Sequence, residues 1–318
     1  MSEERAALVP APALFRSGLR LLLGHFPRSC PLEAQTLDRV DLGDVIREKV
    51  RYQVEPGEWA PAYLFVPARR TGRGPAVLCL HQHAGQFALG KSEPAGLAGN
   101  PQQFYALELA RRGYVTLAAD AICFEERRDA TLEGAAFERF TFTRLIAEGS
   151  TLQTKMLSDA MRGIDYLVSR PEVNPVFIGC VGHSLGGQQT LFTAAMDERI
   201  RAAVSSCGFA SYASLFRERI NHNFAAYVPG LLRYGEVGDV LSLAAPRPFL
   251  ALAGNADPIF PFDGIVATIE RARARYGALG AEERLDFMPV DAGHAFSDSM
   301  RERAYAWFDR WLQPGALA

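Results

Sequence analysis

The chain has 318 residues, of which 48% are hydrophobic and 22% are charged. This composition allows a substantial core, as one large domain or two small ones. The formal net charge is only −2, which gives no electrostatic case for nucleic acid or an anionic membrane as a partner. A small, roughly neutral molecule is the expected binding partner.

The N-terminal part, residues 1–44, is expected to be a helical extension packed on the core. Its stretch LFRSGLRLLLGHF carries Arg16 and Arg20 among apolar residues, which differs from a secretory signal. No apolar run of the sequence reaches the roughly 18 residues of a membrane-spanning helix. The five cysteines are scattered without metal-type pairs, as in a reduced protein. We therefore expect a cytoplasmic protein, and the sequence leaves its oligomeric state open, a homodimer included.

From residue 45 onward, β-rich runs alternate with helical patterns, which indicates βαβ units around a mostly parallel sheet. The first two runs predict an antiparallel edge, and the later ones are nearly all apolar, as buried parallel strands are. The predicted strands are 45–54, 59–66, 75–81, 114–120, 176–182, 202–208, 248–254 and 284–290. The predicted helices are 101–112, 151–170, 184–196 and a terminal one that includes 300–311. We expect about eight strands with helices on both faces, in a single domain over 45–318.

Residues 209–245 are less regular and rich in aromatic side chains. Two interpretations stay open for this segment. It is either a cap over a pocket or an insertion whose aromatic residues pack a small core of their own.

Residues 182–186 read GHSLG and fit the pattern G-x-S-x-G. A serine at the tip of a sharp strand-to-helix turn needs small residues two positions away on each side, because larger side chains would collide with the strand and the helix. The helix that follows also directs the positive end of its dipole toward the turn. Because an apolar run precedes the motif and a helical pattern follows it, Ser184 is the candidate nucleophile.

A serine nucleophile needs a base and an orienting carboxylate. His294 lies in DAGHAFS after the last strand, and Asp257 lies in GNADPIFP after the preceding one. The order Ser184, Asp257, His294 is that of an α/β-hydrolase. Asp291 is a rival carboxylate that is more typical of a turn, and Cys123 is a rival nucleophile without a surrounding turn motif.

The oxyanion of an acyl-transfer reaction is held by two backbone N–H groups. One is expected from Leu185 and the other from the loop HQHAGQF, at His83 or at its neighbour Gln82. His81 and His83 without a third ligand are weak evidence for a metal, so no metal and no organic cofactor is expected. The candidate substrate-pocket residues are Gln82, Gln86, Phe87, Phe124, His183 and His222.

At these residues the sequence resembles the α/β-hydrolase superfamily, and within it the dienelactone hydrolase-like and acetyl xylan esterase-like branch. The resemblance covers about residues 45–313. It rests on LCLHQHAG, DAICFEERR, SRPEVNPVFIGCVGHSLGG, APRPFLALAGNADPIFP and AGHAF. It implies the α/β-hydrolase fold, a serine-type triad and a structural ion-pair cluster at Glu126, Arg127 and Arg128.

The sequence departs from that branch at two points. Position 184 is serine where dienelactone hydrolase has cysteine, and the usual His-Gly of the oxyanion loop is His81-Gln82. The resulting prediction is a serine hydrolase of a small or medium carboxylic ester. The alternatives are an acyltransferase or acyl-eliminating enzyme with the same triad, and a ligand-binding protein without chemistry.

Overall fold

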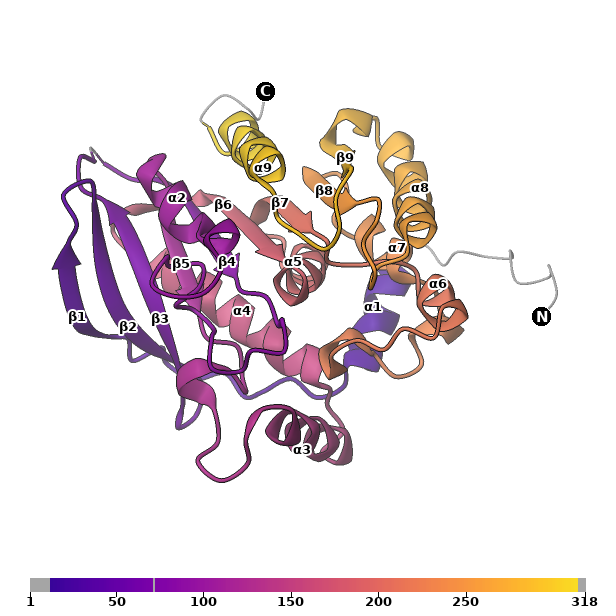
Figure 1. The fold of residues 1–318 in the computed structure, drawn as a ribbon, viewed down its shortest axis with the longest axis horizontal. Helices are drawn as coiled ribbons and strands as arrows, with labels where there is room; N and C mark the ends of the chain where they lie inside the picture. Colours follow the sequence, from indigo (N-terminus) through magenta and orange to yellow (C-terminus); the bar gives the residue numbers. More distant parts are fainter. Residues whose placement is uncertain (1–11, 71, 314–318) are drawn as a thin grey trace.

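A computed structural model describes residues 12–70 and 72–313. Over these residues, nine strands form one sheet in the order β1-β2-β3-β5-β4-β6-β7-β8-β9 (Figure 1). The strands are β1 (Gln35–Asp41), β2 (Val45–Glu55), β3 (Glu58–Pro67), β4 (Gly74–Leu80), β5 (Val115–Ala119), β6 (Val173–His183), β7 (Ile200–Ser206), β8 (Phe249–Gly254) and β9 (Leu285–Val290). In this order, the neighbours from β1 to β5 pair antiparallel. The neighbours from β5 onward, β5-β4-β6-β7-β8-β9, pair parallel. The sheet is thus mostly parallel, with one strand more than the eight expected.

The helices are α1 (Pro12–Leu23), α2 (Tyr105–Arg111), α3 (Gly134–Ala147), α4 (Leu152–Ser169), α5 (Leu185–Met196), α6 (Tyr212–Arg217), α7 (Val237–Ser242), α8 (Phe262–Ala278) and α9 (Asp298–Trp311). Short 3₁₀ turns are η2 (Pro101–Gln103), η3 (Glu125–Arg127), η4 (Phe224–Ala226), η5 (Leu231–Arg233) and η6 (Glu282–Arg284). Of these helices, α3, α6, α7 and α8 were not predicted from the sequence.

The extra strand lies in the segment that was expected to be helical. Within residues 1–44, α1 is helical, but β1 forms an antiparallel edge next to β2. Its sequence QTLDRVD is exposed at nearly every position, so it has no apolar face that a sequence pattern could reveal. The prediction of an all-helical extension is therefore wrong for residues 35–41.

Two apolar layers enclose the sheet. On one face, α2 and α9 pack against β4, β5, β7 and β8. On the other face, α4 and α5 lie under the middle of the sheet (Figure 1). Helix α1 joins this second layer because Phe15, Leu19 and Leu23 are buried in the same cluster.

The irregular segment 209–245 packs on the main core. Phe209, Tyr212 and Leu215 are buried in the same cluster as the sheet and α5. At η4, Phe224 stacks on Phe142 of α3 with ring centroids 4.7 Å apart. Ala225 belongs to a smaller cluster with Leu185, so η4 borders the residue that follows Ser184.

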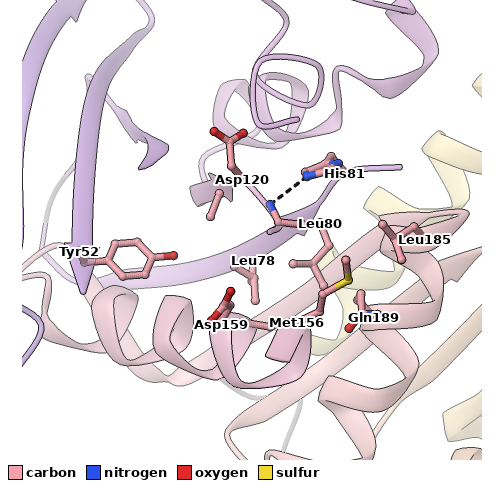
Figure 2. A pocket seen from close by; sticks show the side chains of 12 residues that line it. Tyr52, Leu78, Leu80, His81, Asp120, Met156, Asp159, Leu185 and Gln189 are labelled. Carbon is pink, nitrogen blue, oxygen red and sulfur yellow. Dashed lines mark hydrogen bonds between the residues drawn. The ribbon is translucent and has the colours of Figure 1, made fainter. Parts of the chain in front are cut away.

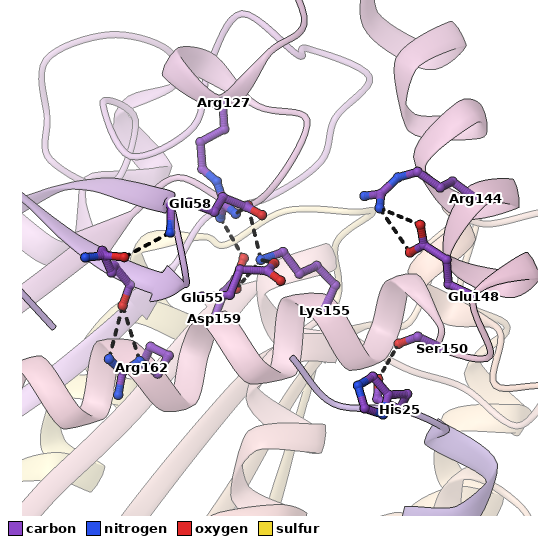
Figure 3. Close-up of polar contacts among 12 residues, drawn as sticks. His25, Glu55, Glu58, Arg127, Arg144, Glu148, Ser150, Lys155, Asp159 and Arg162 are labelled. Carbon is purple, nitrogen blue, oxygen red and sulfur yellow. Dashed lines mark hydrogen bonds and ion pairs between the residues drawn. The ribbon is translucent and has the colours of Figure 1, made fainter. Parts of the chain in front are cut away.

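A buried ion cluster fastens the β2–β3 hairpin to α4 (Figure 3). Asp159 lies 2.7 Å from Arg127 and 3.0 Å from Lys155, and Glu58 contacts both cations. Burial acts to raise the pKa of Glu58, but Arg127 and Lys155 outweigh it and lower the pKa to about 2. Ion pairs thereby hold the turn between β2 and β3 against α4. Within the described residues, no helix has the length and apolar character needed to cross a membrane.

Candidate active site

Ser184 lies where β6 ends and α5 begins. Its backbone has φ 56° and ψ −119°, a conformation that is costly for a residue with a side chain. Its N–H donates to the carbonyl of Ser206 at 2.9 Å, and the N–H of Gln188 donates to the Ser184 carbonyl at 2.9 Å. These bonds to β7 and α5 hold the strained turn and place Ser184 at the carboxyl end of β6.

The glycines around Ser184 are required by contact between backbones. A Cβ on Gly182 would stand 2.3 Å from the carbonyl carbon of Gly186, and one on Gly186 would stand 1.9 Å from the oxygen of Leu80. A Cβ on Gly187 would meet the Ser206 oxygen at 2.8 Å. Real Cβ atoms do not approach backbone so closely, so each of the three positions excludes a side chain. The motif predicts this for Gly182 and Gly186, and Gly187 is a third such position.

His294 and Asp257 form a hydrogen-bonded pair on the loops after β9 and β8. The Nδ1 of His294 lies 2.7 Å from Oδ2 of Asp257. The other oxygen, Oδ1, accepts the N–H groups of Ile259 at 2.9 Å and Phe260 at 3.1 Å. Burial acts to raise the pKa of Asp257, but its bond to His294, the charge of His294 and the two N–H groups outweigh it and hold the pKa below its usual value. Asp257 therefore stays ionised, and Nδ1 of His294 carries a proton that it donates.

The His294 ring lies beside the turn of Ser184. It packs 4.7 Å from the ring of His183, centroid to centroid. Among the hydrogen bonds of the described residues, none joins Ser184 Oγ to His294. The hydrogen bond between a catalytic nucleophile and its base is often long in the absence of substrate and shortens when substrate binds.

Three backbone N–H groups near Ser184 have no acceptor within residues 12–70 and 72–313. They belong to Leu185, His83 and Gln82. The Leu185 N–H is the first of α5, so it adds the positive end of the helix dipole to the site. These are the groups expected to hold an oxyanion, and the structure leaves both His83 and Gln82 available as the second donor.

The two histidines of the oxyanion loop have separate structural partners. His81 Nε2 accepts the N–H of Ala121 at 3.1 Å, and its Nδ1 donates to the carbonyl of Gln82 at 2.8 Å. Burial lowers the pKa of His81 to about 4, so the ring is neutral and organises the loop. His83 Nδ1 accepts the N–H of Gly85, and its Nε2 donates to the buried carboxylate of Glu138 on α3 at 3.2 Å.

The oxyanion loop is also fixed by a buried lysine. Lys91 is fully buried, with its Nζ 2.9 Å from Asp120 and 2.6 Å from both Glu125 and Glu126. The backbone N–H groups of Gly90 and Ser92 donate to Glu125 as well. Burial raises the pKa of Asp120 to about 7, although Lys91 opposes this shift. The loop after β4 is thus tied to the loop after β5.

The predicted pocket residues fall into two groups. Gln86 is exposed, Phe87 stacks on Phe124 at 5.0 Å, and the ring of His222 packs 4.3 Å from that of Phe260, which in turn packs 5.8 Å from His294. Gln86 and Phe87 thus belong to the oxyanion loop, and His222 lies near His294 through Phe260.

The three other pocket candidates, Gln82, Phe124 and His183, are buried or bound to partners within the protein. The amide of Gln82 donates to Glu93 at 2.9 Å, and Phe124 is fully buried. His183 is buried behind His294 with its Nδ1 3.0 Å from Ser206 Oγ. Burial, together with the nearby His294, lowers the pKa of His183 to about 3, so this ring stays neutral and does not compete with His294 for a proton.

The rival residues have different surroundings. Burial raises the pKa of Cys123 to about 11, so its thiol keeps its proton, and Asp291 is exposed beyond the turn. Within the part of the chain that the structure describes, two groups of side chains of metal-ligand type lie close together: Cys207 with Asp257 and His294, and Asp120 with Glu125 and Glu126. In the second group the Lys91 ammonium already lies among the carboxylates. In the first, burial raises the pKa of Cys207 to about 12, so its thiol is a poor metal ligand.

Sequence reasoning missed Lys91 and Glu138 as supports of the oxyanion loop. Glu138 lies on α3, which contacts the loop only after folding. Lys91 lies in the loop itself, eleven residues after the end of β4, but it belongs to no motif. The run FEERR after β5 was the one visible signal, because the family resemblance implies an ion-pair cluster at Glu126, Arg127 and Arg128. In the structure Glu126 pairs with Lys91 and Arg127 pairs with Asp159, in two separate clusters. The prediction is wrong for Arg128, whose Nε donates to the carbonyl of Glu125 instead.

The mostly parallel sheet, the glycine-flanked serine turn and the His–Asp pair on later strand-end loops define an α/β-hydrolase. The model of the dienelactone hydrolase family matches residues 61–313, and the chain belongs to that family. It is accordingly a hydrolase that acts on ester bonds.

Comparisons with individual proteins agree with this assignment. The chain is 32% identical over 302 residues to YtaP of Bacillus subtilis (strain 168), which is named as a hydrolase, and the match covers 93% of this chain and 98% of that relative. It is similar in structure to a protein of Bacteroides fragilis NCTC 9343 provisionally described as an acetyl xylan esterase, with a TM-score of 0.73, 16% identity and coverage of 96% and 83%. A glucuronoyl esterase from Solibacter usitatus gives a TM-score of 0.69 at 14% identity, with coverage of 92% and 91%. At these identities the two structures support the fold.

Proposed function

We propose that the protein hydrolyses a small or medium carboxylic ester through an acyl-enzyme on Ser184. The observation that carries this proposal is the strained, glycine-packed turn at Ser184 beside the hydrogen-bonded His294–Asp257 pair. A serine held in this way gains a base whose tautomer is fixed by a buried carboxylate.

The steps follow from the positions of the groups. Ser184 Oγ attacks the ester carbonyl carbon while Nε2 of His294 takes its proton, and Asp257 stabilises the imidazolium that forms. The oxyanion is held by the N–H groups of Leu185 and His83. His294 then gives the proton to the departing alcohol. Water, activated by His294, attacks the acyl-enzyme and releases the acid.

The proposal is supported by the names of the relatives, since esterases of acetyl and glucuronoyl groups share this fold. The roughly neutral net charge of the chain, −2, also suits such a substrate. A cytoplasmic location and a homodimer remain predictions from the sequence.

The first test is the intact mass of the protein after exposure to a fluorophosphonate, with Ser184→Ala alongside. We expect one adduct on the wild-type chain and none on the variant, together with hydrolysis of activated short-chain esters that Ser184→Ala lowers at least about 10³-fold. Turnover by Ser184→Ala at the wild-type rate would contradict the assignment. Hydrolysis in ¹⁸O-labelled water places the label in the released acid, whereas an unlabelled acyl product would indicate acyl transfer or elimination.

A further inference from the structure

An internal cavity of about 40 Å³ lies between β2 and the first turns of α5 (Figure 2). Tyr52 lies at one side of it, and Leu185 and Gln189 lie at the other. Because Leu185 directly follows Ser184 and supplies the expected oxyanion N–H, the cavity reaches the wall of the candidate active site. A volume of this size holds about three waters, or an unbranched chain of about four to five atoms.

Most of the cavity wall is apolar. The side chains that make it so come from β4, β5, the loop after β5 and α4: Leu78, Leu80, Ala119, Ala121, Met156 and Ala160. Such a wall favours a hydrocarbon chain over water.

The polar side chains of the wall are almost all occupied. Asp120 is bound by Lys91, and Asp159 is bound by Arg127 and Lys155. Both ring nitrogens of His81 have backbone partners, and Gln189 exchanges hydrogen bonds with Gln153. Each of these groups already has a hydrogen-bond or ion-pair partner within the protein.

The hydroxyl of Tyr52 is the exception. It is fully buried and has no hydrogen-bond partner among the described residues. Gly163 of α4 makes room for it, since a Cβ there would stand 3.1 Å from the hydroxyl oxygen. Burial, with the nearby Asp159, raises the pKa of Tyr52 far above its ordinary value, so the hydroxyl keeps its proton. A buried hydroxyl without a partner costs free energy, and a ligand that completes its hydrogen bond would recover that cost.

We propose that this cavity is the acyl pocket of the enzyme and that it selects a short, unbranched acyl chain bearing a neutral oxo or hydroxyl group near its far end. The chain would pack on the apolar wall, and its oxygen would accept the hydrogen bond of Tyr52. A terminal carboxylate is disfavoured because no lysine or arginine lines the cavity, while two carboxylates do. This inference rests on the proposed ester hydrolysis at Ser184.

The test compares 4-nitrophenyl pentanoate with 4-nitrophenyl 4-oxopentanoate on the full-length enzyme. The two esters differ only at C4, which is a methylene in the pentanoate and a carbonyl in the 4-oxopentanoate. Each kcat/KM is divided by the rate of alkaline hydrolysis of the same ester, so that differences in intrinsic reactivity are removed. We expect a wild-type preference of at least fivefold for the oxo ester, as one hydrogen bond provides. Tyr52→Phe should lower this ratio to about one.

The control is Tyr166→Phe. The Tyr166 ring stacks on that of Tyr52 at 5.1 Å but does not line the cavity, so its variant should keep the wild-type ratio. Because each ratio compares two esters on one preparation, loss of folded enzyme cancels. A second variant, Ala160→Val, narrows the pocket and should lower the pentanoate-to-acetate ratio of kcat/KM about tenfold.

The outcomes separate the two proposals. If Ser184 is labelled by the fluorophosphonate and esters are hydrolysed, but the oxo ester has no advantage or Tyr52→Phe leaves its advantage unchanged, the pocket assignment is overturned and the esterase stands. If Ser184 is not labelled and no ester is hydrolysed, both proposals are overturned.

Discussion

Gly186 lies so close to the end of β4 that an added Cβ would stand 1.9 Å from the Leu80 carbonyl oxygen. Backbone on both sides of this contact belongs to the sheet and to α5, so neither side can yield. Gly186→Ala should therefore lower the free energy of unfolding by at least about 4 kcal/mol, or prevent folding. Urea denaturation of the purified variant measures this loss.

Gly277→Ala is the matched control for that substitution. Gly277 lies in α8, and the nearest atom to its added Cβ would be 3.5 Å away. This change should leave stability unchanged or raise it by up to about 1 kcal/mol, because alanine is the better helix former. Equal losses at Gly186 and Gly277 would contradict the backbone-contact explanation of the motif.

Asp257 offers a second prediction at the residue scale. Asp257→Asn keeps the side-chain volume but replaces the carboxylate that holds the Nδ1 proton of His294. With the wrong tautomer favoured, kcat should fall by about 10³ to 10⁴ while KM changes little. The exposed Asp291→Asn is the control and should retain wild-type kcat. A larger loss at Asp291 than at Asp257 would make the rival carboxylate the orienting one.

At the scale of elements, the ion cluster between the β2–β3 hairpin and α4 predicts a pH dependence of stability. The folded pKa of Glu58, about 2, lies below its ordinary value of 4.5. The contribution of the Glu58 carboxylate to the free energy of unfolding is thus present above pH 4.5 and is lost as the pH falls toward 2. Glu58→Gln should be less stable than wild type by about 1 to 2 kcal/mol at pH 7, and this gap should close near pH 2. Urea denaturation across this range checks it, and a constant gap would contradict the linkage.

An element is most readily predicted from the sequence where it is buried on both faces. Strand β9, which precedes His294, is only partly buried at most of its positions. Strand β6, which carries Ser184, and strand β8, which precedes Asp257, are apolar runs buried at most positions, so both their existence and the loops at their ends could be predicted. Strand β1 could not, because it is polar at nearly every position. Tyr52 could not be placed either, because an alternating strand does not reveal which residue will face a helix glycine such as Gly163.

At the scale of the whole molecule, α1 belongs to the core rather than to its surface. Leu19 is fully buried there, whereas Leu14 on the same helix is 68% exposed. Arg16 donates to the carbonyls of Ala195 and Leu243, which ties α1 to two distant segments. Helix α1 thus stabilises the layer that contains α5.

This arrangement gives a paired prediction. Leu19→Ala should lower the free energy of unfolding by about 2 to 5 kcal/mol through the lost burial and the cavity left behind. Leu14→Ala should change it by less than about 0.5 kcal/mol. Thermal unfolding followed by circular dichroism measures both, and similar values for the two variants would show that α1 does not pack as described.

The glycines and the alanines near the active site differ in whether they tolerate replacement by a larger residue during evolution. The glycines at 182, 186 and 187 touch backbone and admit no side chain, so a lineage that keeps the fold must keep them. The alanines at 119, 121 and 160 border empty space instead, where added methyl groups meet a cavity. Descendants of this sequence could therefore diverge in the acids they release through single changes at these alanines, while the nucleophile turn stays the same.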